Sequence, residues 1–290
     1  MCESKLSPCD FNKEADRGLV NKIIPFSCVD GPGNRSSIFF QACDFRCRYC
    51  HNPETQALCI NCGACVEVCP TGALSLLDGK VIWNEDKCCA CDKCLGVCTH
   101  NSTPKTKLMT VDDIVAELGT ALPFITGITV SGGECTFYHR FITRLFRRFH
   151  ELGKTAFADT NGQLLFKDMP WLTDEMDMAM LDIKAWSEDK HRLLTGRGNK
   201  TVIENFHYLA DINKLYEVRT VVIPDYLDNE ETVTEVSKVL KNYPDIRYKL
   251  IKFRPWGVRP AMNVSVPSDE YMNRLKKLAM DIGVSEVVIS

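Results

Sequence analysis

The sequence has no strong excess of charge of either sign and no long hydrophobic run near its start. Its 35 basic and 38 acidic residues give a net charge of −3, which argues against a general binder of nucleic acids or anionic membranes. Residues 1–19 carry charges throughout, so we expect neither a signal peptide nor a membrane-spanning helix there. A cytoplasmic protein is expected, with no nucleic acid and no membrane among its partners.

Cysteine, in contrast, is abundant, with 16 residues among 290. A reducing cytoplasm keeps thiols free for metals, so a disulfide scaffold is not expected. The length and the apolar content of 45% are sufficient for one large α/β domain or two smaller ones. The composition therefore indicates a metalloprotein, and iron–sulfur clusters would imply an oxygen-poor, anaerobic setting.

Three cysteines fall within eight residues, at Cys43, Cys47 and Cys50. Three thiolates can hold three corners of a [4Fe–4S] cluster and leave the fourth iron open to a ligand. The spacing by itself also permits an incomplete zinc knuckle or three unrelated buried thiols. Residues 36–42 form a buried-strand pattern that runs into this loop. The loop is thereby placed at the carboxyl end of a strand, where α/β barrels carry their active sites.

Nine further cysteines lie from residue 59 to residue 98, and eight of them form two copies of the spacing found in bacterial two-cluster ferredoxins. In that pattern the fourth thiol of each copy binds the cluster of the other copy. The sequence therefore predicts one cluster held by Cys59, Cys62, Cys65 and Cys98, and another held by Cys88, Cys91, Cys94 and Cys69. Two zinc knuckles are the alternative. Cys89 is out of register, and Thr99 stands where the second copy would usually have proline.

From residue 104 onward, helical and strand patterns alternate, as in parallel βαβ units. The expected strands cover residues 20–24, 36–42, 127–130, 155–158, 178–181, 218–224 and 248–253. About six strands counted from Ile38 are too few for a closed eight-stranded barrel. We predict a partial TIM-type (β/α)6 barrel with a lateral opening, built from residues 20–53 and 104–290. Residues 54–103 would be an inserted ferredoxin-like module, and residues 1–19 an N-terminal extension.

Polar or glycine motifs mark four of these strands in turn. They are Gly132-Gly133-Glu134, Asp159-Thr160, Asp182-Ile183-Lys184, and Arg219 within its strand. Singly, each has a plain explanation as a turn, a helix cap or a surface ion pair. Because the carboxyl ends of parallel strands converge on one face, we expect them to meet beside the Cys43 loop.

Each motif has a chemical use in such a site. The two glycines let backbone approach a ligand amine closely, and Glu134 can accept a hydrogen bond from that amine. Asp182 and Lys184 can hold hydroxyl groups and a carboxylate. Asp159 and Thr160 are oxygen donors of the kind that bind a cation.

These motifs resemble the radical S-adenosylmethionine superfamily, and more closely the activating enzymes of glycyl radical enzymes. The resemblance rests on the three-cysteine loop with Tyr49 before its last thiol, on Gly-Gly-Glu, and on the stretches 29–35, 50–53, 159–162 and 180–184. It covers nearly the whole chain. The eight-cysteine insert resembles that of activases with a ferredoxin-like module, and residues 23–33 resemble the opening of the YjjW group.

The resemblance implies an enzyme that reductively cleaves S-adenosylmethionine, as cosubstrate, at a cluster on Cys43, Cys47 and Cys50. The products would be methionine and a 5′-deoxyadenosyl radical, which takes hydrogen from a backbone glycine of a partner glycyl radical enzyme. Three [4Fe–4S] clusters and a flavodoxin or ferredoxin reductant are implied. The implied cosubstrate contacts are Tyr49, His51, Gly132, Gly133, Glu134, Asp182, Ile183, Lys184, Arg219 and Arg254. A monovalent cation is implied at Asp159, Thr160, Met180 and Asp182, and the partner's glycine loop beside Asp30, Gly31 and Gly33.

Three positions depart from the family pattern: Ala42 replaces a glycine, Cys135 replaces proline or alanine, and Arg254 stands where relatives often have a histidine that contacts the cosubstrate. Among the other histidines, His191 precedes a stretch that resembles a family Thr-Gly turn. Two other functions remain open. One is a radical enzyme acting on a small molecule or RNA, although the near-neutral charge argues against RNA. The other is a dedicated electron carrier, which leaves the Cys43 loop and the barrel unexplained.

Overall fold

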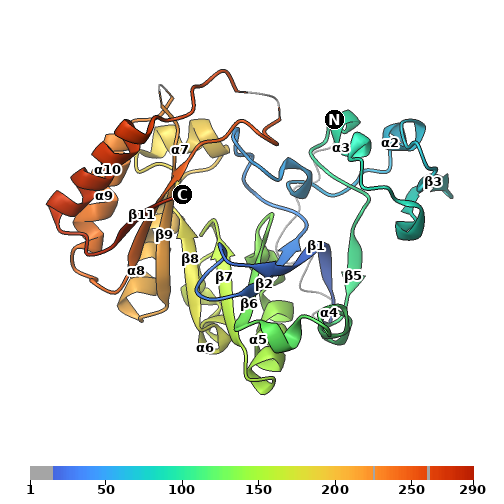
Figure 1. Cartoon of the computed structure of the whole chain (residues 1–290), viewed down its shortest axis with the longest axis horizontal. Coiled ribbons are helices and arrows are strands. Elements are labelled where there is room, and N and C mark those ends of the chain that lie inside the picture. The colour runs from blue at the N-terminus through green and yellow to red at the C-terminus, as the bar shows by residue number, and fades with distance from the viewer. Residues whose placement is uncertain (1–15, 225, 260–261) are drawn as a thin grey trace.

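The computed structural model describes residues 16–224, 226–259 and 262–290, and its centre is a nine-stranded sheet (Figure 1). The strand order is β11-β10-β9-β8-β7-β6-β2-β1-β5. From β2 to β11 all neighbouring pairs are parallel, whereas β1 and β5 pair antiparallel at one edge. The strands are β1 Gly18–Ser27, β2 Arg35–Phe40, β5 Lys107–Met109, β6 Gly127–Gly132, β7 Thr155–Thr160, β8 Met178–Asp182, β9 Leu215–Val222, β10 Arg247–Lys252 and β11 Val287–Ile289.

Helices between the parallel strands cover the outer face of the sheet (Figure 1). They are α4 Val111–Glu117, α5 His139–Glu151, α6 Pro170–Glu175, α7 Glu188–Thr195, α8 Lys200–Asp211, α9 Asn229–Leu240 and α10 Asp269–Ile282. Within the described ranges, none of the helices combines the length and the apolar character needed to cross a membrane.

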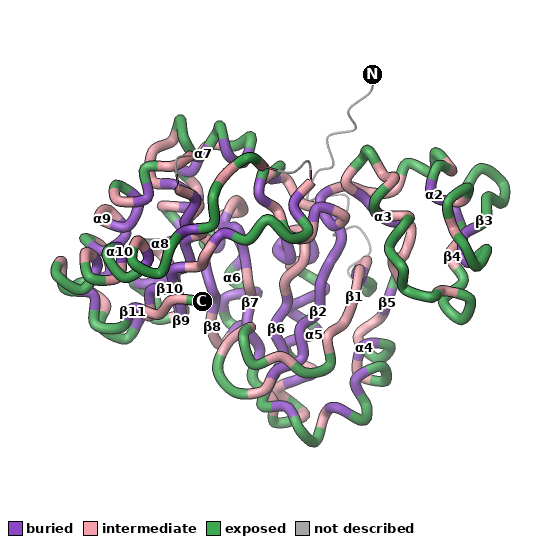
Figure 2. The backbone as a smooth tube through the Cα atoms, turned by 45° about the horizontal axis from the view of Figure 1, so that its top comes forward, coloured by how far each residue is buried: buried purple, intermediate pink, exposed green. Residues whose placement is uncertain are grey.

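Local sequence accounts for these elements. Every residue of β2 is buried, which is typical of a central parallel strand covered on both sides (Figure 2). Helix α5 presents Phe141, Phe146 and Phe149 to the core at helical spacing. Helix α4 begins with a capping box, in which Thr110 Oγ1 accepts from the Asp113 N–H and the Asp113 carboxylate accepts from the Thr110 N–H.

The six strands predicted from the alternating pattern are all present, and the mostly parallel open sheet is consistent with a partial TIM barrel. Two strands of this sheet were not predicted, β5 and β11. Each has only three residues, which is too short for an alternating pattern to stand out. Cys2 and Cys9, which belong to neither cysteine pattern, lie outside the described residues. Strand β1 is longer than expected and begins at Gly18.

Residues 54–103 project beyond the β5 edge of the sheet (Figure 1). They contain two short helices, α2 Ala64–Glu67 and α3 Lys93–Val97, and a hairpin formed by β3 Leu74–Leu77 and β4 Lys80–Trp83. Within this segment, Cys65, Leu74 and Val81 form a small buried cluster separate from the main core. Such a core is too small to stabilise the segment by apolar burial alone. The segment therefore needs a further source of stability.

Candidate active site

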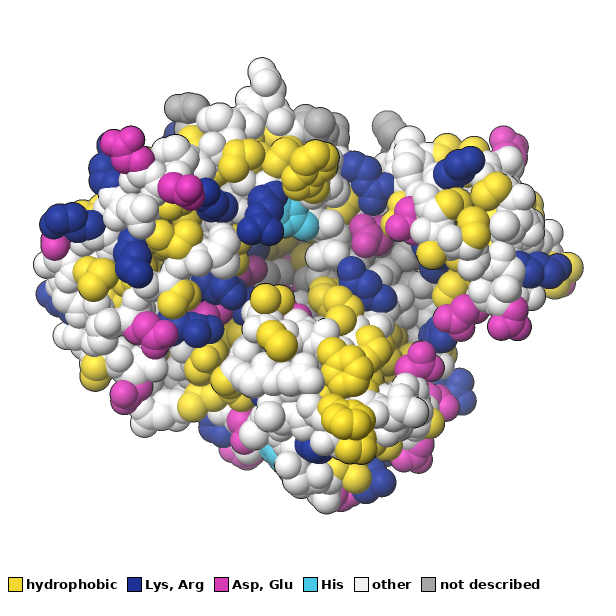
Figure 3. All heavy atoms as spheres, in the orientation of Figure 1, with side chains coloured by type: hydrophobic (Ala, Val, Ile, Leu, Met, Phe, Trp, Pro, Cys, Tyr) yellow, Lys and Arg dark blue, Asp and Glu magenta, His cyan; other side chains and the backbone are white. Residues whose placement is uncertain are grey.

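A cavity at the carboxyl ends of the parallel strands joins the three-cysteine loop to the strand-end motifs. Figure 3 shows the surface hollowed between the barrel and the projecting segment. The lining of this strand-end cavity includes Cys43, Cys47, Tyr49, Cys50, His51, Gly132, Gly133, Asp159, Asp182, Lys184 and Arg219. These residues come from five strand ends and lie between residues 43 and 219 of the sequence, as expected when parallel strands converge on one face. Such a cavity can hold a small polar ligand beside a metal cluster.

The cysteine loop is held in place from behind by helix α7. The Arg46 N–H donates to the Thr195 carbonyl at 2.7 Å, and the Arg48 N–H donates to the Leu194 carbonyl at 3.0 Å. His191, one turn earlier in α7, is fully buried and packs edge-on against the Phe45 ring with 5.3 Å between ring centroids. Burial lowers the pKa of His191 to about 4, so the ring is neutral at pH 7. His191 therefore supports the loop and does not face the cavity.

The loop thiols suit a cluster better than free cysteines. Burial raises the pKa of Cys47 to about 12, with a smaller opposing effect from Lys184. A thiol in this setting stays protonated until a metal displaces its proton. In the part of the chain that the structure describes, no three His, Cys, Asp or Glu side chains lie close enough to hold one metal ion. A four-iron cluster binds each thiolate at a separate corner, so this result concerns single ions such as zinc and not a cluster.

At Gly132 and Gly133, the end of β6 passes so close to other backbone that a side chain would not fit. A Cβ atom on Gly132 would lie 2.2 Å from the Phe40 nitrogen, and one on Gly133 would lie 2.1 Å from the Ala42 carbonyl oxygen. The Glu134 N–H donates to that same Ala42 carbonyl at 2.8 Å. The expectation that these glycines make room for a ligand amine is therefore incomplete. Both glycines line the cavity, but their first effect is structural: because they have no side chain, β6 can lie against the start of the cysteine loop.

The backbone conformation of Ala42 is one that glycine, the residue expected here from the family resemblance, adopts without strain. The φ angle of Ala42 is 80°, in the left-handed region that costs an L-residue with a side chain about 1 kcal/mol. Ala42 is also fully buried. The departure from glycine therefore introduces a small strain immediately before the first thiol.

The Glu134 side chain points into the protein and does not line the cavity. Its carboxylate is buried and accepts hydrogen bonds from the Thr136 hydroxyl at 2.6 Å, the Thr160 hydroxyl at 2.8 Å and the Asn161 N–H at 2.8 Å. Burial raises the pKa of Glu134 to about 7, while these hydrogen bonds lower it. The Glu134 side chain links the end of β6 to the end of β7, and its contact with a ligand amine stays a prediction.

Ile183 was predicted to contact the cosubstrate but does not line the cavity, whereas Asp182 and Lys184 do. The Ile183 side chain is fully buried in the main core, and its N–H donates to the Arg219 carbonyl at 2.8 Å. Lys184 Nζ lies 2.8 Å from the Asp182 carboxylate. Burial alone would lower the pKa of Lys184, but Asp182, Tyr49 and Cys47 raise it above its ordinary value, so the side chain is charged.

Tyr49 contributes a polar atom that is available to a ligand. Its hydroxyl oxygen is buried and has no hydrogen-bond partner among the described residues. Lys184 Nζ lies over the Tyr49 ring, 5.6 Å from its centroid. Buried polar groups are nearly always paired, so an unpaired hydroxyl on a cavity wall indicates a site completed by a ligand.

The four residues predicted to hold a cation have partners from the chain itself. Arg219 Nη1 lies 3.1 Å from the Asp159 carboxylate, and Arg219 Nη2 contacts the Met180 sulfur. The Thr160 hydroxyl is bonded to Glu134, and Asp182 is paired with Lys184. All four groups are thus paired within the chain, and the cation site stays a prediction. Burial raises the pKa of Asp159 to about 6, and Arg219 acts against this rise.

Of His51 and Arg254, two further residues predicted to contact the cosubstrate, only His51 lines the cavity. His51 Nε2 is hydrogen-bonded to the Arg254 carbonyl at 2.8 Å, and the His51 ring stacks on Phe253. The Arg254 side chain is exposed and does not line the cavity. Only the Arg254 backbone approaches the site, and the contact of its side chain with the cosubstrate stays a prediction.

Asp30 and its two glycines precede β2, near the amino ends of the parallel strands. The Asp30 carboxylate accepts from the Ser27 and Ser37 hydroxyls, each at 2.6 Å, and Thr129 Oγ1 donates to the Asp30 carbonyl at 2.6 Å. Gly31 and Gly33 have φ angles of 116° and 75°, which the turn requires. None of the three lines the strand-end cavity.

Sequence reasoning missed two polar residues beside the cysteine loop and one inside the sheet. Asn161 Nδ2 donates to the Asp44 carboxylate at 3.2 Å, and Gln56 Nε2 donates to the Cys47 carbonyl at 3.4 Å. Glu217 is fully buried beneath Arg219. An acidic residue within an otherwise apolar strand pattern was the available signal for Glu217, whereas Gln56 and Asn161 carried none of comparable strength.

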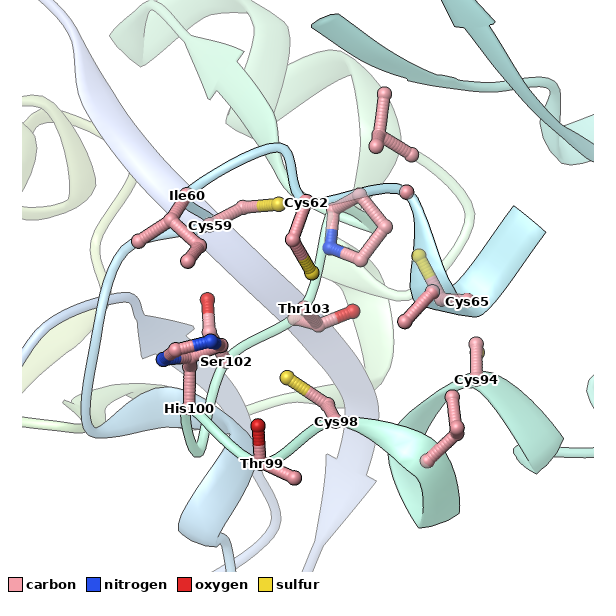
Figure 4. A pocket seen from close by; sticks show the side chains of 15 residues that line it. Cys59, Ile60, Cys62, Cys65, Cys94, Cys98, Thr99, His100, Ser102 and Thr103 are labelled. Atoms are coloured by element: carbon pink, nitrogen blue, oxygen red, sulfur yellow. The ribbon is translucent and has the colours of Figure 1, made fainter. Parts of the chain in front are cut away.

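The thiols of the projecting segment border two small cavities. The first insert cavity is lined by Cys59, Cys62, Cys65 and Cys98, with Cys94 at its border. Figure 4 shows the sulfur atoms of the first four turned toward a shared space. The second insert cavity is lined by Cys69, Cys88, Cys91 and Cys94, with Cys89 beside them. Each cavity therefore combines thiols from both copies of the repeated spacing.

Comparisons with known proteins agree with the residues of the site. A model of the radical SAM superfamily matches residues 37–236. A Haemophilus influenzae protein named as a glycyl-radical enzyme activating enzyme is 30% identical, over 93% of this chain and 95% of that protein. The isethionate sulfite-lyase activating enzyme of Desulfovibrio desulfuricans is 28% identical, over 93% of this chain and 96% of its own.

Solved structures agree in fold. QueE from Escherichia coli matches with a TM-score of 0.53 at 11% identity, over 99% of each chain. SuiB from Streptococcus suis, bound to its precursor peptide SuiA, matches with a TM-score of 0.57 at 14% identity, over 86% of this chain and 47% of that chain. The family match and the sequence relatives thus extend over most of the chain, and the three cysteines on which the resemblance rests line the strand-end cavity. The chain belongs to the radical SAM superfamily and, within it, to the glycyl-radical enzyme activating enzymes.

Proposed function

We propose that this protein activates a partner glycyl radical enzyme and that S-adenosylmethionine binds in the strand-end cavity. One observation carries the proposal: a single cavity joins the thiols of Cys43, Cys47 and Cys50 to the polar ends of β6, β7, β8 and β9. The three thiols would hold a [4Fe–4S] cluster with one iron left for the cosubstrate. When bound, that cluster supplies the electron that splits the sulfonium of the cosubstrate into methionine and a 5′-deoxyadenosyl radical.

The remaining residues bind and orient the cosubstrate. Lys184 and Arg219 are cations on the cavity wall and attract its carboxylate. Asp182 accepts hydrogen bonds from ribose hydroxyls, and the unpaired Tyr49 hydroxyl offers one more polar contact. The buried Phe45, supported by His191, closes the wall behind the loop against water.

The partner is reached through the open side of the sheet. The nine strands do not close into a barrel, because β5 and β11 are both edges. An open side admits a loop of another protein more readily than a closed pocket does. Asp30 and Gly31 are half-buried and Gly33 is exposed, in the turn before β2 that the family resemblance assigns to the glycine loop of the partner. A flavodoxin or ferredoxin is the class of reductant that would supply electrons.

The projecting segment would hold two further [4Fe–4S] clusters, three in all. The two insert cavities support this assignment, because the lining of each includes the four thiols that the crossed arrangement assigns to one cluster, together with one further cysteine. The clusters would also supply the stability that the small apolar core lacks. Ferredoxin-like clusters at this position would pass electrons from the reductant toward the cysteine loop.

The proposed function is tested with anaerobically reconstituted protein, dithionite and S-adenosylmethionine. We expect 5′-deoxyadenosine as product and, after addition of a candidate partner, a glycyl radical signal by electron paramagnetic resonance on that partner. Formation of 5′-deoxyadenosine with no radical on any candidate, but with turnover of an added metabolite, would favour a small-molecule radical enzyme. Reconstituted protein that forms no 5′-deoxyadenosine would instead be an electron carrier.

The crossed arrangement of thiols makes a separate prediction. Cys59→Ser and Cys98→Ser should each remove one cluster, and the double variant should lose no more iron than either single variant, because both thiols border the first insert cavity. From about twelve irons, each of the three variants should retain about eight. If Cys98 instead belonged with Cys88, Cys91 and Cys94, the double variant would retain only about four. Iron analysis with protein quantification distinguishes the two outcomes.

A further inference from the structure

Glu217 is a fully buried acid for which the proposed function has so far provided no role. It lies in β9, on the strand face opposite Val218 and Val222, which pack into the main core. It does not line the strand-end cavity. A carboxylate removed from water at this depth is strongly destabilising unless cations and hydrogen bonds compensate it.

Three cations from two strands compensate Glu217. Arg219 Nε donates to one carboxylate oxygen at 2.6 Å, and Arg247 Nε donates to the other at 2.6 Å. Lys249 Nζ lies farther away, at 3.9 Å from the first oxygen. Because β9 and β10 are parallel neighbours, with Arg247 paired to Glu217 and Lys249 paired to Arg219, the register of the sheet brings these groups together. Glu217 is thus held from β10 and in turn holds Arg219.

The contact with Glu217 determines how Arg219 enters the cavity. A guanidinium is a planar fork with five N–H donors in fixed directions. When Nε is bonded to Glu217, the plane of the fork is set, and its two Nη groups extend toward Asp159, which lines the cavity, and toward the buried Met180 sulfur. Two N–H donors of the Nη groups then remain for a ligand. Without Glu217, the fork would be free to turn and satisfy the acidic groups Asp159 and Asp182 alone.

We propose that Glu217 is a positioning residue that orients the Arg219 guanidinium for the carboxylate of the bound cosubstrate. This inference rests on the proposed function, because it takes S-adenosylmethionine as the ligand. Loss of Glu217 should therefore weaken the binding of ligands that carry the amino-acid carboxylate. It should not weaken the binding of ligands that end at the thioether. Arg247 acts one step further away, by holding Glu217 in place.

The test is equilibrium binding to anaerobically reconstituted holoprotein, with two ligands. S-adenosylmethionine carries the carboxylate, and 5′-methylthioadenosine lacks it. For Glu217→Gln we expect an affinity for S-adenosylmethionine about tenfold lower than wild type, as for loss of a charged hydrogen bond. The affinity for 5′-methylthioadenosine should stay within about twofold. Glu286→Gln is the matched control, because Glu286 is the exposed second partner of Arg247 at 3.9 Å and should change neither affinity.

Three outcomes would overturn the inference: unchanged binding of S-adenosylmethionine by folded Glu217→Gln, an equal loss for both ligands, or the same selective loss in Glu286→Gln. If Glu217→Gln does not fold, Glu217→Asp retains the charge but draws the carboxylate back by one methylene group. The same selective loss, smaller in size, is then expected, and unchanged binding contradicts the inference. Wild-type protein that binds and cleaves S-adenosylmethionine while Glu217 has no effect would refute this role alone. Wild-type protein that does neither would refute the proposed function.

Discussion

A Cys47→Ser variant should form no detectable 5′-deoxyadenosine, whereas a Cys28→Ser variant should match the wild-type protein. Cys47 lines the strand-end cavity with Cys43 and Cys50, and burial keeps its thiol neutral unless a metal binds it. With three thiols the cluster has no spare ligand, so the loss of one removes the cluster and the electron that it supplies. Cys28 is exposed and belongs to neither cysteine pattern.

The measurement combines chromatography of 5′-deoxyadenosine with iron analysis of the same samples. Iron should fall from about twelve to about eight per chain in Cys47→Ser, because the two insert clusters remain. The Cys28→Ser sample should keep the full content. Product formation by Cys47→Ser at more than a small fraction of the wild-type rate would exclude the Cys43 loop as the site of cleavage.

A Gly133→Ala variant should lose about 3 kcal/mol or more of unfolding free energy, together with the catalytic cluster. Its added Cβ would lie 2.1 Å from the Ala42 carbonyl oxygen and 2.7 Å from the Thr55 carbonyl oxygen. Both contacts are with backbone, which cannot turn aside as a flexible side chain can. The strand end and the cysteine loop would have to separate, breaking the bond from the Glu134 N–H to Ala42. Urea unfolding and iron analysis measure the two effects.

Gly96→Ala is the matched control for this substitution. Gly96 lies in helix α3, and a Cβ added there meets no atom within 4 Å. Alanine is also the better helix former, so stability should be unchanged or slightly higher. Equal stability of Gly133→Ala and wild-type protein would mean that β6 and the cysteine loop are not packed as closely as the structure has them.

The sequence by itself determined the chemistry of this protein, because cluster loops and strand patterns are local properties of the chain. The spacings of Cys43, Cys47 and Cys50 are fixed by covalent connection, and so are the two repeats of the insert. Alternating strand and helix patterns then predicted the mostly parallel sheet. A parallel sheet in turn predicts that its strand ends meet, which is why the cavity contains Asp159, Asp182, Lys184 and Arg219 beside the thiols.

Only the tertiary structure decided where each polar side chain points and what it is paired with. Glu134 turns into the protein toward Thr160, and Ile183 faces the core, although both belong to motifs that reach the cavity. Gly133 is required by Ala42, some 90 residues away in the sequence. Glu217 meets Arg247 through the register of β9 and β10. Such pairings depend on which strands are neighbours and how they are aligned, and a single strand pattern contains neither.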